Sequence, residues 1–246
     1  MLHVRSSASL EDAAADVFVP SYVRTERGIR ATVRTPRIAR ELMIPSPAVF
    51  NLSNALGAIA CAEALGISAD AIETGLSRAY APGRMELYPS ASGRIMGVVD
   101  YAHNGMSLET LLRDLRASYP DREFAVVFGA TGGKGVDRRE TMGEAAGKLA
   151  DRIVITEDDP GPEDPALICD AIARAVSAQG NENWRIVLDR SEAIRTAVNE
   201  THGPAVVIVT GKGNAPFMLR HGVREPYEPD GDQLRRALAD WEREHV

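Results

Sequence analysis

Two identical Gly-Lys-Gly triplets, at residues 133–135 and 211–213, are the first chemically suggestive feature of this 246-residue sequence. Lysine occurs only three times in the chain, and Lys134 and Lys212 are two of the three. A compact positive charge on permissive glycine backbone suits the binding of an anion. The first triplet is not a P-loop, because it lacks the Gly-Lys-Ser/Thr ending. We expect both lysines to lie in anion-binding loops; chance placement in surface turns is the alternative.

A second candidate is the segment VDYAHNG, in which Asp100 and His103 directly follow an apolar run. An aspartate in this place can accept hydrogen bonds from a ribose hydroxyl, or it can hold a cation. An Asx turn followed by a helix cap explains the same residues equally well.

Arg138 and Arg139 follow the first triplet at the expected start of a helix. A guanidinium group matches a carboxylate in bidentate geometry, so one of these arginines could grip a carboxylate substrate. A solvated arginine pair is the alternative.

The segment TEDDPGPEDP contains five acids, namely Glu157, Asp158, Asp159, Glu163 and Asp164. Acids gathered after a strand could recognise an amino group or a metal. The alternative is an acidic turn that stabilises the positive end of the next helix.

These segments lie between alternating strand-like and helix-like stretches. Five runs expected to be strands are RIMGVVDYA, EFAVVFGA, RIVIT, WRIVL and AVVIVTG. The alternation predicts an α/β domain with a mostly parallel sheet flanked by helices. Ligands of such sheets bind at the carboxyl ends of the strands. Four loops should therefore share one rim: 100–104, 129–139, 156–161 and 211–214.

The first part of the chain has a different character. Short strand-like pieces over residues 3–47 precede two expected helices at 51–66 and 68–80. Residues 81–94 contain Pro, Gly and Ser and are expected to form a linker. This shift in composition predicts two domains, 1–89 and 90–246.

Composition narrows the class of protein. A net charge of −7 argues against nucleic acid as a partner, and no apolar run is long enough to span a membrane. The N-terminus lacks an apolar signal core. The two cysteines and the histidines show no metal-ligand spacing. We expect a cytoplasmic protein with no metal ligands and no membrane partner.

Taken in order, several segments resemble the Mur ligase family, most closely its UDP-N-acetylmuramoyl-tripeptide synthetase branch. They are FNLSNALGAIACAEALGI, PGRME, VDYAHNGMSLETLL, VFGATGGKGVDRRETMGEAAGKLADRIVITEDDPGPEDP and VTGKGN. The resemblance implies that residues 1–89 are the back part of the family's central ATPase domain, β-rich and helical. It implies that residues 90–246 are its Rossmann-like C-terminal domain.

The activity implied by this resemblance is a ligase of peptidoglycan precursor synthesis. With ATP and Mg²⁺, such an enzyme phosphorylates the carboxylate of a UDP-linked muramoyl peptide, and an amino acid then attacks the acyl phosphate. The resemblance assigns Asn51 and Asn54 to the adenine, Arg84 to the ATP phosphates and Asp100 to the ribose, with His103 nearby.

The amino-acid side is assigned in the same way. Arg139 aligns with the arginine that grips the carboxylate of the amino acid, and Asp158, Asp159 and Gly211 align with recognition segments. Members specific for diaminopimelate have Asp-Asn-Pro-Arg, whereas residues 158–161 are Asp-Asp-Pro-Gly. The missing arginine favours a diamino acid with one carboxylate, such as lysine or ornithine. The family's Gly-Lys-Gly-His-Glu is Gly-Lys-Gly-Asn-Ala here, and its missing Glu counts against a basic amino acid.

The resemblance also leaves out part of the family's machinery. The UDP-binding domain, the P-loop, the magnesium-binding Glu and His and the modified lysine would all precede residue 1. We therefore expect the chain to be the C-terminal portion of a ligase and inactive alone. The alternatives are a non-catalytic nucleotide- or amino-acid-binding or assembly module, and one half of a split ligase completed by a chain with the P-loop.

Overall fold

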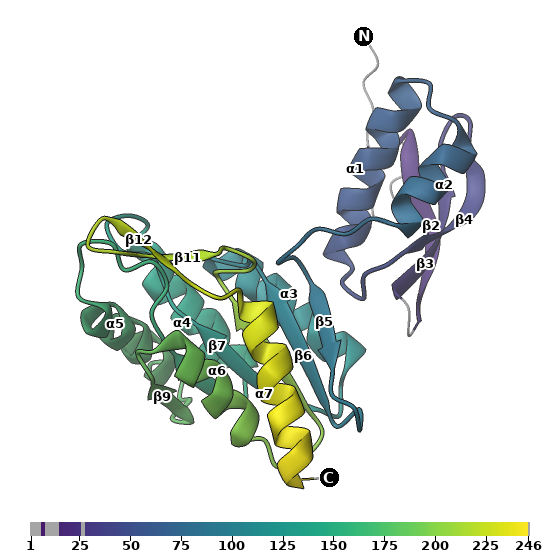
Figure 1. The fold of residues 1–246 in the computed structure, drawn as a ribbon. Helices are drawn as coiled ribbons and strands as arrows, with labels where there is room; N and C mark the ends of the chain where they lie inside the picture. The colour runs from purple at the N-terminus through teal and green to yellow at the C-terminus, as the bar shows by residue number, and fades with distance from the viewer. Residues whose placement is uncertain (1–5, 8–14, 26–27, 246) are drawn as a thin grey trace. The chain divides into compact units, whose positions relative to one another are not determined.

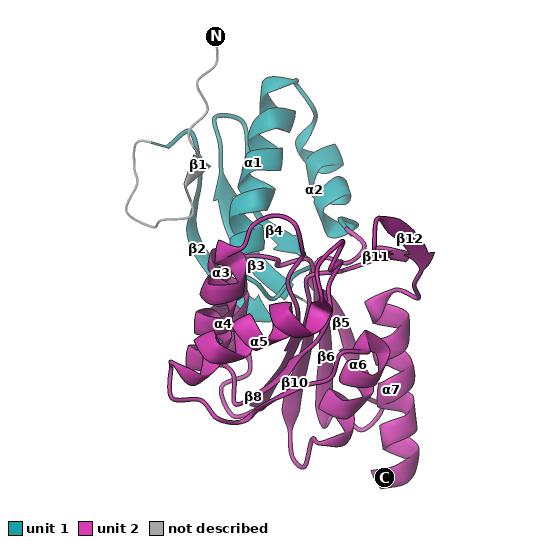
Figure 2. Ribbon diagram, turned by 90° about the vertical axis from the view of Figure 1, so that its left-hand side faces the viewer, with its two compact units in different colours: residues 1–80 teal, residues 81–246 magenta. Residues whose placement is uncertain are grey.

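The computed structural model describes residues 6–7, 15–25 and 28–245. The chain forms two compact units, residues 1–80 and 81–246, which are coloured separately in Figure 2 and are described here one at a time. Within the described residues, no helix is both long and apolar enough to cross a membrane.

The first unit is a four-stranded sheet packed against two helices. Its elements are β1 (Ser6–Ser7), β2 (Val17–Thr25), β3 (Gly28–Arg34), β4 (Ala39–Ile44), α1 (Phe50–Ala64) and α2 (Ala69–Ser77). Strands β2, β3 and β4 pair antiparallel in that order, and β1 pairs parallel to β2. Leu52, Leu56 and Ile59, spaced by four and three residues, form the buried stripe of α1. This confirms the sequence-based prediction of strands followed by two helices.

The second unit contains a six-stranded sheet and five helices within the described residues (Figure 1). Its elements are β5 (Glu86–Pro89), β6 (Ile95–Asp100), α3 (Gly105–Ser118), β7 (Glu123–Phe128), α4 (Asp137–Leu149), β8 (Arg152–Ile155), α5 (Pro165–Ser177), β9 (Trp184–Ile186), α6 (Arg190–Asn199), β10 (Ala205–Thr210), β11 (Phe217–Arg220), β12 (Val223–Pro226) and α7 (Asp230–His245). The sheet order is β5-β6-β10-β7-β8-β9, and β11 and β12 form a separate hairpin.

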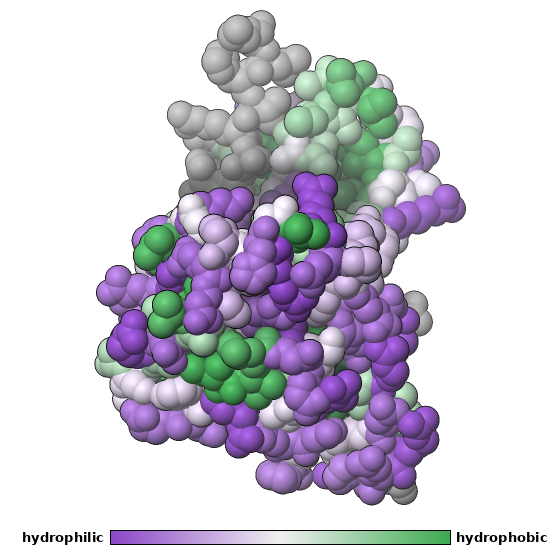
Figure 3. All heavy atoms as spheres, turned by 60° about the vertical axis from the view of Figure 1, so that its left-hand side comes forward, coloured by the Kyte–Doolittle hydropathy of each residue, from purple (hydrophilic) through white to green (hydrophobic). Residues whose placement is uncertain are grey.

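Helices cover both faces of this sheet. Figure 2 shows α3, α4 and α5 on one side of the strands and α6 and α7 on the other. Every residue of β10 is buried, as expected for a strand covered on both faces. Leu234, Leu238 and Trp241 of α7 pack on this core. On the face drawn in Figure 3, the second unit is mostly hydrophilic, with one contiguous hydrophobic patch and a few separate hydrophobic spots. The mostly parallel sheet predicted from the alternating pattern is confirmed.

The strand order explains why the rim is built where it is. Strand β10, last of the parallel strands in the sequence, lies between β6 and β7, the first two. The chain thus crosses the sheet from β6 to β9 in one direction and then returns to β10, which lies beside β6. In open α/β sheets, such a switch point leaves a crevice at the carboxyl ends of the strands, where ligands bind.

One predicted linker contains a strand. Residues 81–94 were expected to connect two domains, but β5 within them pairs antiparallel with β6. The alternation of Glu86, Leu87 and Tyr88 gives a four-residue edge strand too short to stand out from Pro and Gly. By contacts, the second unit begins at Ala81. The family domain boundary at residue 90 remains a prediction.

Candidate functional site

The four loops expected to share a rim lie against one another. The Gly132 amide donates to the Asp159 carbonyl oxygen at 3.1 Å, and the Gly211 amide donates to the Asp100 carbonyl oxygen at 3.3 Å. A Cβ atom on Gly129 would lie 2.2 Å from the Thr156 carbonyl oxygen, so glycine is required for this approach. The carboxyl ends of β6, β7, β8 and β10 therefore carry one continuous set of loops.

The first Gly-Lys-Gly loop contacts an anion, which is a side-chain carboxylate of the same chain. The Gly133 amide donates to Oε1 of Glu163 at 2.5 Å. Nη2 of Arg139 lies 2.8 Å from each of the two Glu163 oxygens. Lys134 is exposed and makes no ion pair with the described residues. The Gly133 amide and Arg139 thus bind an internal carboxylate, and the expected role of Lys134 in anion binding stays a prediction.

The five acids of the neighbouring loop have separate surroundings. Glu157 pairs with Arg220 of the β11–β12 hairpin, with Nε to Oε2 at 2.9 Å. Asp164 caps α5 by accepting from the Ala166 amide at 2.9 Å, as the alternative interpretation predicts for one acid. Glu163, Asp159 and Asp158 face the rim loops. The acidic segment is therefore not one uniform site.

Lys212 of the second triplet binds a carboxylate of the same chain. Its side chain is 2% exposed, and Nζ lies 2.6 Å from Oδ1 of Asp159. That same oxygen also accepts from the Leu219 amide at 2.7 Å. Asp159 has a φ of 45°, which turns its side chain toward these donors. Lys212 and Asp159 thus neutralise each other beneath the rim.

Asp158 is the rim carboxylate without a donor. It is 4% exposed, and none of the described groups donates a hydrogen bond to its carboxylate. Burial raises its pKa to about 6, although the charges of Arg190 and Lys212 oppose this shift. A Cβ at Gly211 would lie 2.3 Å from Oδ2, so Gly211 leaves the space that the carboxylate fills. A largely buried carboxylate that takes no hydrogen bond from the described residues is suited to a cation or an ammonium group.

Asp100 is engaged by backbone on both oxygens. Oδ2 accepts from the Met85 amide and Oδ1 accepts from the Ala102 amide, each at 2.8 Å. The second contact is the Asx turn that sequence reasoning gave as the alternative. Burial raises the pKa of Asp100, and these amide donors partly offset that effect. Each oxygen keeps acceptor capacity, so a ribose contact stays a prediction.

An exposed cation–aromatic cluster lies next to Asp100. The Arg84 guanidinium carbon is 4.8 Å from the centre of the Tyr101 ring, and the Tyr101 and His103 rings are 5.0 Å apart. Nδ1 of His103 lies 2.8 Å from the Tyr101 carbonyl oxygen. Tyr101 was not among the candidate residues taken from the sequence, although an aromatic residue between Asp100 and His103 was the available signal.

In the first unit, Asn51 and Asn54 lie together in the first turn of α1. Nδ2 of Asn54 donates to Oδ1 of Asn51 at 3.0 Å, and Nδ2 of Asn51 donates to Oγ of Ser46 at 2.7 Å. Asn54 is exposed and Asn51 is half-buried. Their predicted role toward adenine stays a prediction.

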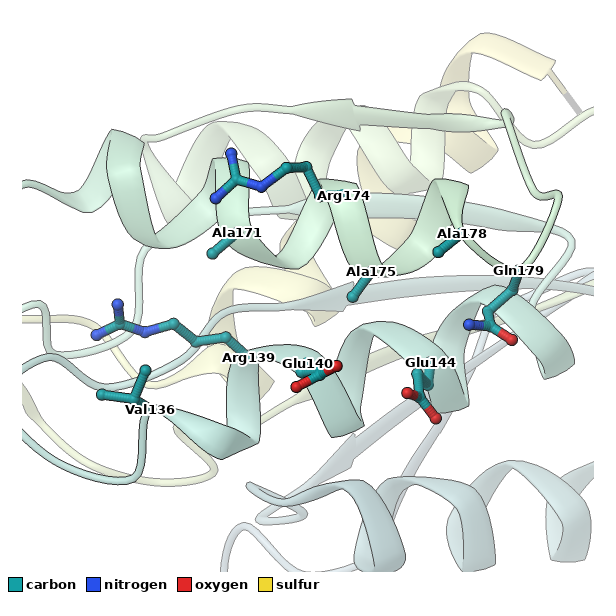
Figure 4. A pocket seen from close by; sticks show the side chains of 9 residues that line it. All are labelled: Val136, Arg139, Glu140, Glu144, Ala171, Arg174, Ala175, Ala178 and Gln179. Carbon is teal, nitrogen blue, oxygen red and sulfur yellow. The ribbon is translucent and has the colours of Figure 1, made fainter.

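A groove of about 410 Å³ runs between α4 and α5 (Figure 4). The guanidinium groups of Arg139 and Arg174 lie at the same end of it, and Ala171 and Ala175 form part of its apolar wall. Arg139 is thus reachable from the groove as well as from the loop that carries Glu163.

The described residues offer no metal centre, since no three His, Cys, Asp or Glu side chains gather among them.

Comparison with known proteins identifies the family. Residues 83–213, just over half of the chain, match the family model for the Mur ligase, glutamate ligase domain. The chain belongs to the Mur ligase family. It is 36% identical, over 77% of its length, to the UDP-N-acetylmuramoyl-L-alanyl-D-glutamate--L-lysine ligase of Streptococcus thermophilus. That match covers 38% of the relative, so the chain spans well under half of it.

Solved structures of Mur ligases have the same fold. A UDP-N-acetylmuramoyl-L-alanyl-D-glutamate--2,6-diaminopimelate ligase aligns with 97% of this chain and 48% of its own, at a TM-score of 0.62 and 25% identity. The folylpolyglutamate synthase of Mycobacterium tuberculosis, solved with ADP and AMPPCP, aligns with 80% of this chain and 45% of its own. Its TM-score is 0.67 at 22% identity, so this second likeness concerns the fold. The predicted family and its Rossmann-like fold are confirmed.

Proposed function

We propose that this Mur ligase chain is the amino-acid-binding portion of an ATP-dependent ligase of peptidoglycan precursor synthesis. The amino acid would be a diamino acid with one carboxylate, joined to a UDP-linked muramoyl peptide. The observation that carries the proposal is the unpartnered, buried Asp158 carboxylate at a rim that also holds Arg139. An ammonium group and a carboxylate on one ligand match these two side chains.

The chemistry assigns different tasks to the two ends of the ligand. ATP would transfer its γ-phosphoryl group to the peptide carboxylate, and the α-amine would displace phosphate from the acyl phosphate as the amide bond forms. Asp158 would hold the side-chain ammonium and Arg139 the carboxylate, so the rim would orient the amine toward the acyl phosphate. Gly161, at a φ of 60°, adds no second cation, which supports one carboxylate rather than two.

The nucleotide would bind near the loop that contains Asp100 and His103, rather than at Asp158 and Arg139. In the second unit, Arg84, Asp100 and His103 would contact the phosphates and ribose of ATP. For the first unit, the role of Asn51 and Asn54 toward the adenine is a separate proposal. The solved structure with ADP and AMPPCP supports a nucleotide in this fold class. The cradle for the transferred phosphates and the Mg²⁺ ligands would come from sequence outside residues 1–246, on the same protein or on another chain.

Isothermal titration of the chain with L-lysine, L-ornithine and meso-diaminopimelate tests this function. We expect L-lysine or L-ornithine to bind more tightly than diaminopimelate, and Asp158→Asn to weaken binding at least about tenfold. A bound ammonium group stabilises the ionised form of Asp158. Ligand binding at a pH near the Asp158 pKa of about 6 should therefore release protons. Titration in buffers of different ionisation enthalpy measures that release.

Asp170→Asn is the matched control, because Asp170 is an exposed carboxylate on α5 outside the rim loops. It should leave both affinity and proton release unchanged. Equal effects of the two substitutions, or tighter binding of diaminopimelate, would contradict the proposed amino-acid class. Absence of all binding would favour the assembly-module alternative.

A further inference from the structure

The contact between Glu163 and Arg139 is more than a surface ion pair. Arg139 is 11% exposed and lies in the first turn of α4, while Glu163 is 35% exposed in the loop before α5. Both oxygens of Glu163 contact the same nitrogen of Arg139, and one of them also takes the Gly133 amide. A single carboxylate thus occupies the donors that the Gly-rich loop offers to an anion.

The geometry of the guanidinium group determines which donors of Arg139 remain for a ligand while Glu163 is bound. A carboxylate can bind in bidentate fashion to the edge formed by Nε and Nη2, or to the edge formed by the two Nη nitrogens. Both edges include Nη2, which is the nitrogen that Glu163 holds. Nη2 has one hydrogen on each edge, so Glu163 uses one of them together with the single Gly133 N–H. A ligand carboxylate therefore cannot take the Gly133 amide and that Nη2 hydrogen while Glu163 stays in place.

Arg139 keeps one donor that the described residues do not satisfy. Its Nε is buried and has no hydrogen-bond partner. A buried N–H without a partner costs free energy, and native proteins rarely leave one so. Arg139 also lines the groove between α4 and α5, so this side chain is not sealed off (Figure 4). The present contact thus leaves the hydrogen-bonding capacity of Arg139 incompletely used.

We propose that Glu163 is an internal carboxylate that closes the anion site of Gly133 and Arg139, and that an incoming ligand carboxylate must displace it. This inference rests on the proposed function, in which Arg139 grips the carboxylate of the amino acid. Glu163 lies in a loop and is partly exposed, so its side chain can swing away without disturbing the sheet. Displacement makes the site selective, because a weakly bound anion would not replace Glu163.

The pKa of Glu163 agrees with a closed site at neutral pH. The Gly133 amide and the Arg139 guanidinium both lower this pKa, so the carboxyl stays ionised and competes as a full charge. The competition is therefore between two carboxylates for one set of donors.

The test compares the full chain with its Glu163→Gln variant. Each is titrated with sodium acetate and, separately, with L-lysine, while the Gly133 amide signal is followed by NMR. Removal of the internal competitor should tighten binding of both probes about tenfold, because the ligand carboxylate then no longer competes with a charged internal group for the same donors. The added substitution Arg139→Ala should abolish the gain.

Glu140→Gln is the matched control. Glu140 is an exposed neighbour of Arg139 that lines the same groove, so its loss removes one negative charge nearby without opening the site. It should change affinity by less than about twofold. Glu163→Asp, whose shorter side chain keeps the charge, provides a second variant should Glu163→Gln fail to fold, and we expect it to give an intermediate gain.

The two proposals fail in different ways. If the wild type binds L-lysine and Glu163→Gln leaves this affinity unchanged or lower, the closed-site proposal is overturned. Glu163 would then be a residue that positions Arg139. A gain for acetate without any binding of L-lysine would support the closed site and count against the proposed amino acid. No binding of either probe by any variant would overturn the closed site, since Arg139 would then hold no external anion.

Discussion

Asp158 and Asp159 are neighbours in the chain, yet their carboxylates lie in opposite surroundings. Asp159 contacts Lys212 and the Leu219 amide, whereas Asp158 is buried without a donor. The change of direction comes from the φ of 45° at Asp159, a value that only a few per cent of non-glycine residues adopt. From the sequence, both acids were equal candidates for an amino group. The structure favours Asp158 as the free one.

This arrangement predicts how stability depends on pH. The pKa of Asp158 is about 6 in the folded chain against an ordinary value of 3.8, so the folded state binds more protons between these values. Stability attributable to Asp158 is therefore present below about pH 4 and is lost as pH rises to about 6, by about 1–3 kcal/mol. Urea unfolding of wild type and Asp158→Asn between pH 4 and pH 7 measures this loss.

The difference in unfolding free energy between the two proteins carries the test, because other carboxylates titrate in both. Glu63 and Glu228 have lowered pKa values and contribute in the opposite direction, but equally in the two proteins. Parallel stability curves for wild type and variant across this range would show that Asp158 is not the buried, weakly acidic group described here.

At the scale of elements, α4 and α5 pack closely because glycine replaces a side chain at their contact. A Cβ at Gly143 would lie 2.6 Å from Cβ of Ala175 and 2.8 Å from the Ile172 carbonyl oxygen. This contact sets the position of Arg139 on α4 relative to the loop that leads into α5. The Arg139–Glu163 pair thus depends on helix packing as well as on its own loops.

Gly143→Ala should therefore destabilise the second unit. Overpacking costs about 1–3 kcal/mol, and the better helix propensity of alanine returns about 1 kcal/mol of it. Gly57→Ala in α1 is the matched control, because nothing lies within 4 Å of its added Cβ. That change should stabilise its unit by about 0.5–1 kcal/mol. Calorimetric unfolding compares them; equal stabilisation by both would refute the close contact.

The elements that sequence reasoning found and missed differ in their local signal. The Val and Ile residues of β6, β7, β8 and β10 predict a buried parallel sheet. The loops at the carboxyl ends of these strands are then the predicted rim loops. The β11–β12 hairpin and α7 were not predicted, although Leu234, Leu238 and Trp241 have helical spacing. The pairings of Glu163 with Arg139 and of Asp159 with Lys212 were not predictable, since they join residues that are 24 and 53 positions apart in the sequence.

At the scale of the whole chain, the second unit has the parts of an independent domain. It contains its own sheet, with helices on both faces and a continuous core from Ile95 to Trp241. The decisive question is where it begins, because composition suggested residue 90 and contacts place the division at Ala81. Residues 81–89 contribute β5, the Met85 amide that binds Asp100, and Tyr88, which packs on the core.

We predict that residues 81–246 fold alone, and that the fragment 90–246 is less stable by at least about 2 kcal/mol. Loss of the Met85 amide leaves one oxygen of the buried Asp100 without its donor, which costs about 1–3 kcal/mol, and β6 becomes an exposed edge. Urea unfolding of both fragments measures the difference. Asp100→Asn gives the internal check: it should cost 81–246 more than 90–246, because only the longer fragment has the Met85 amide to lose. Equal stability of the two fragments would mean that β5 is dispensable and that the domain begins after it.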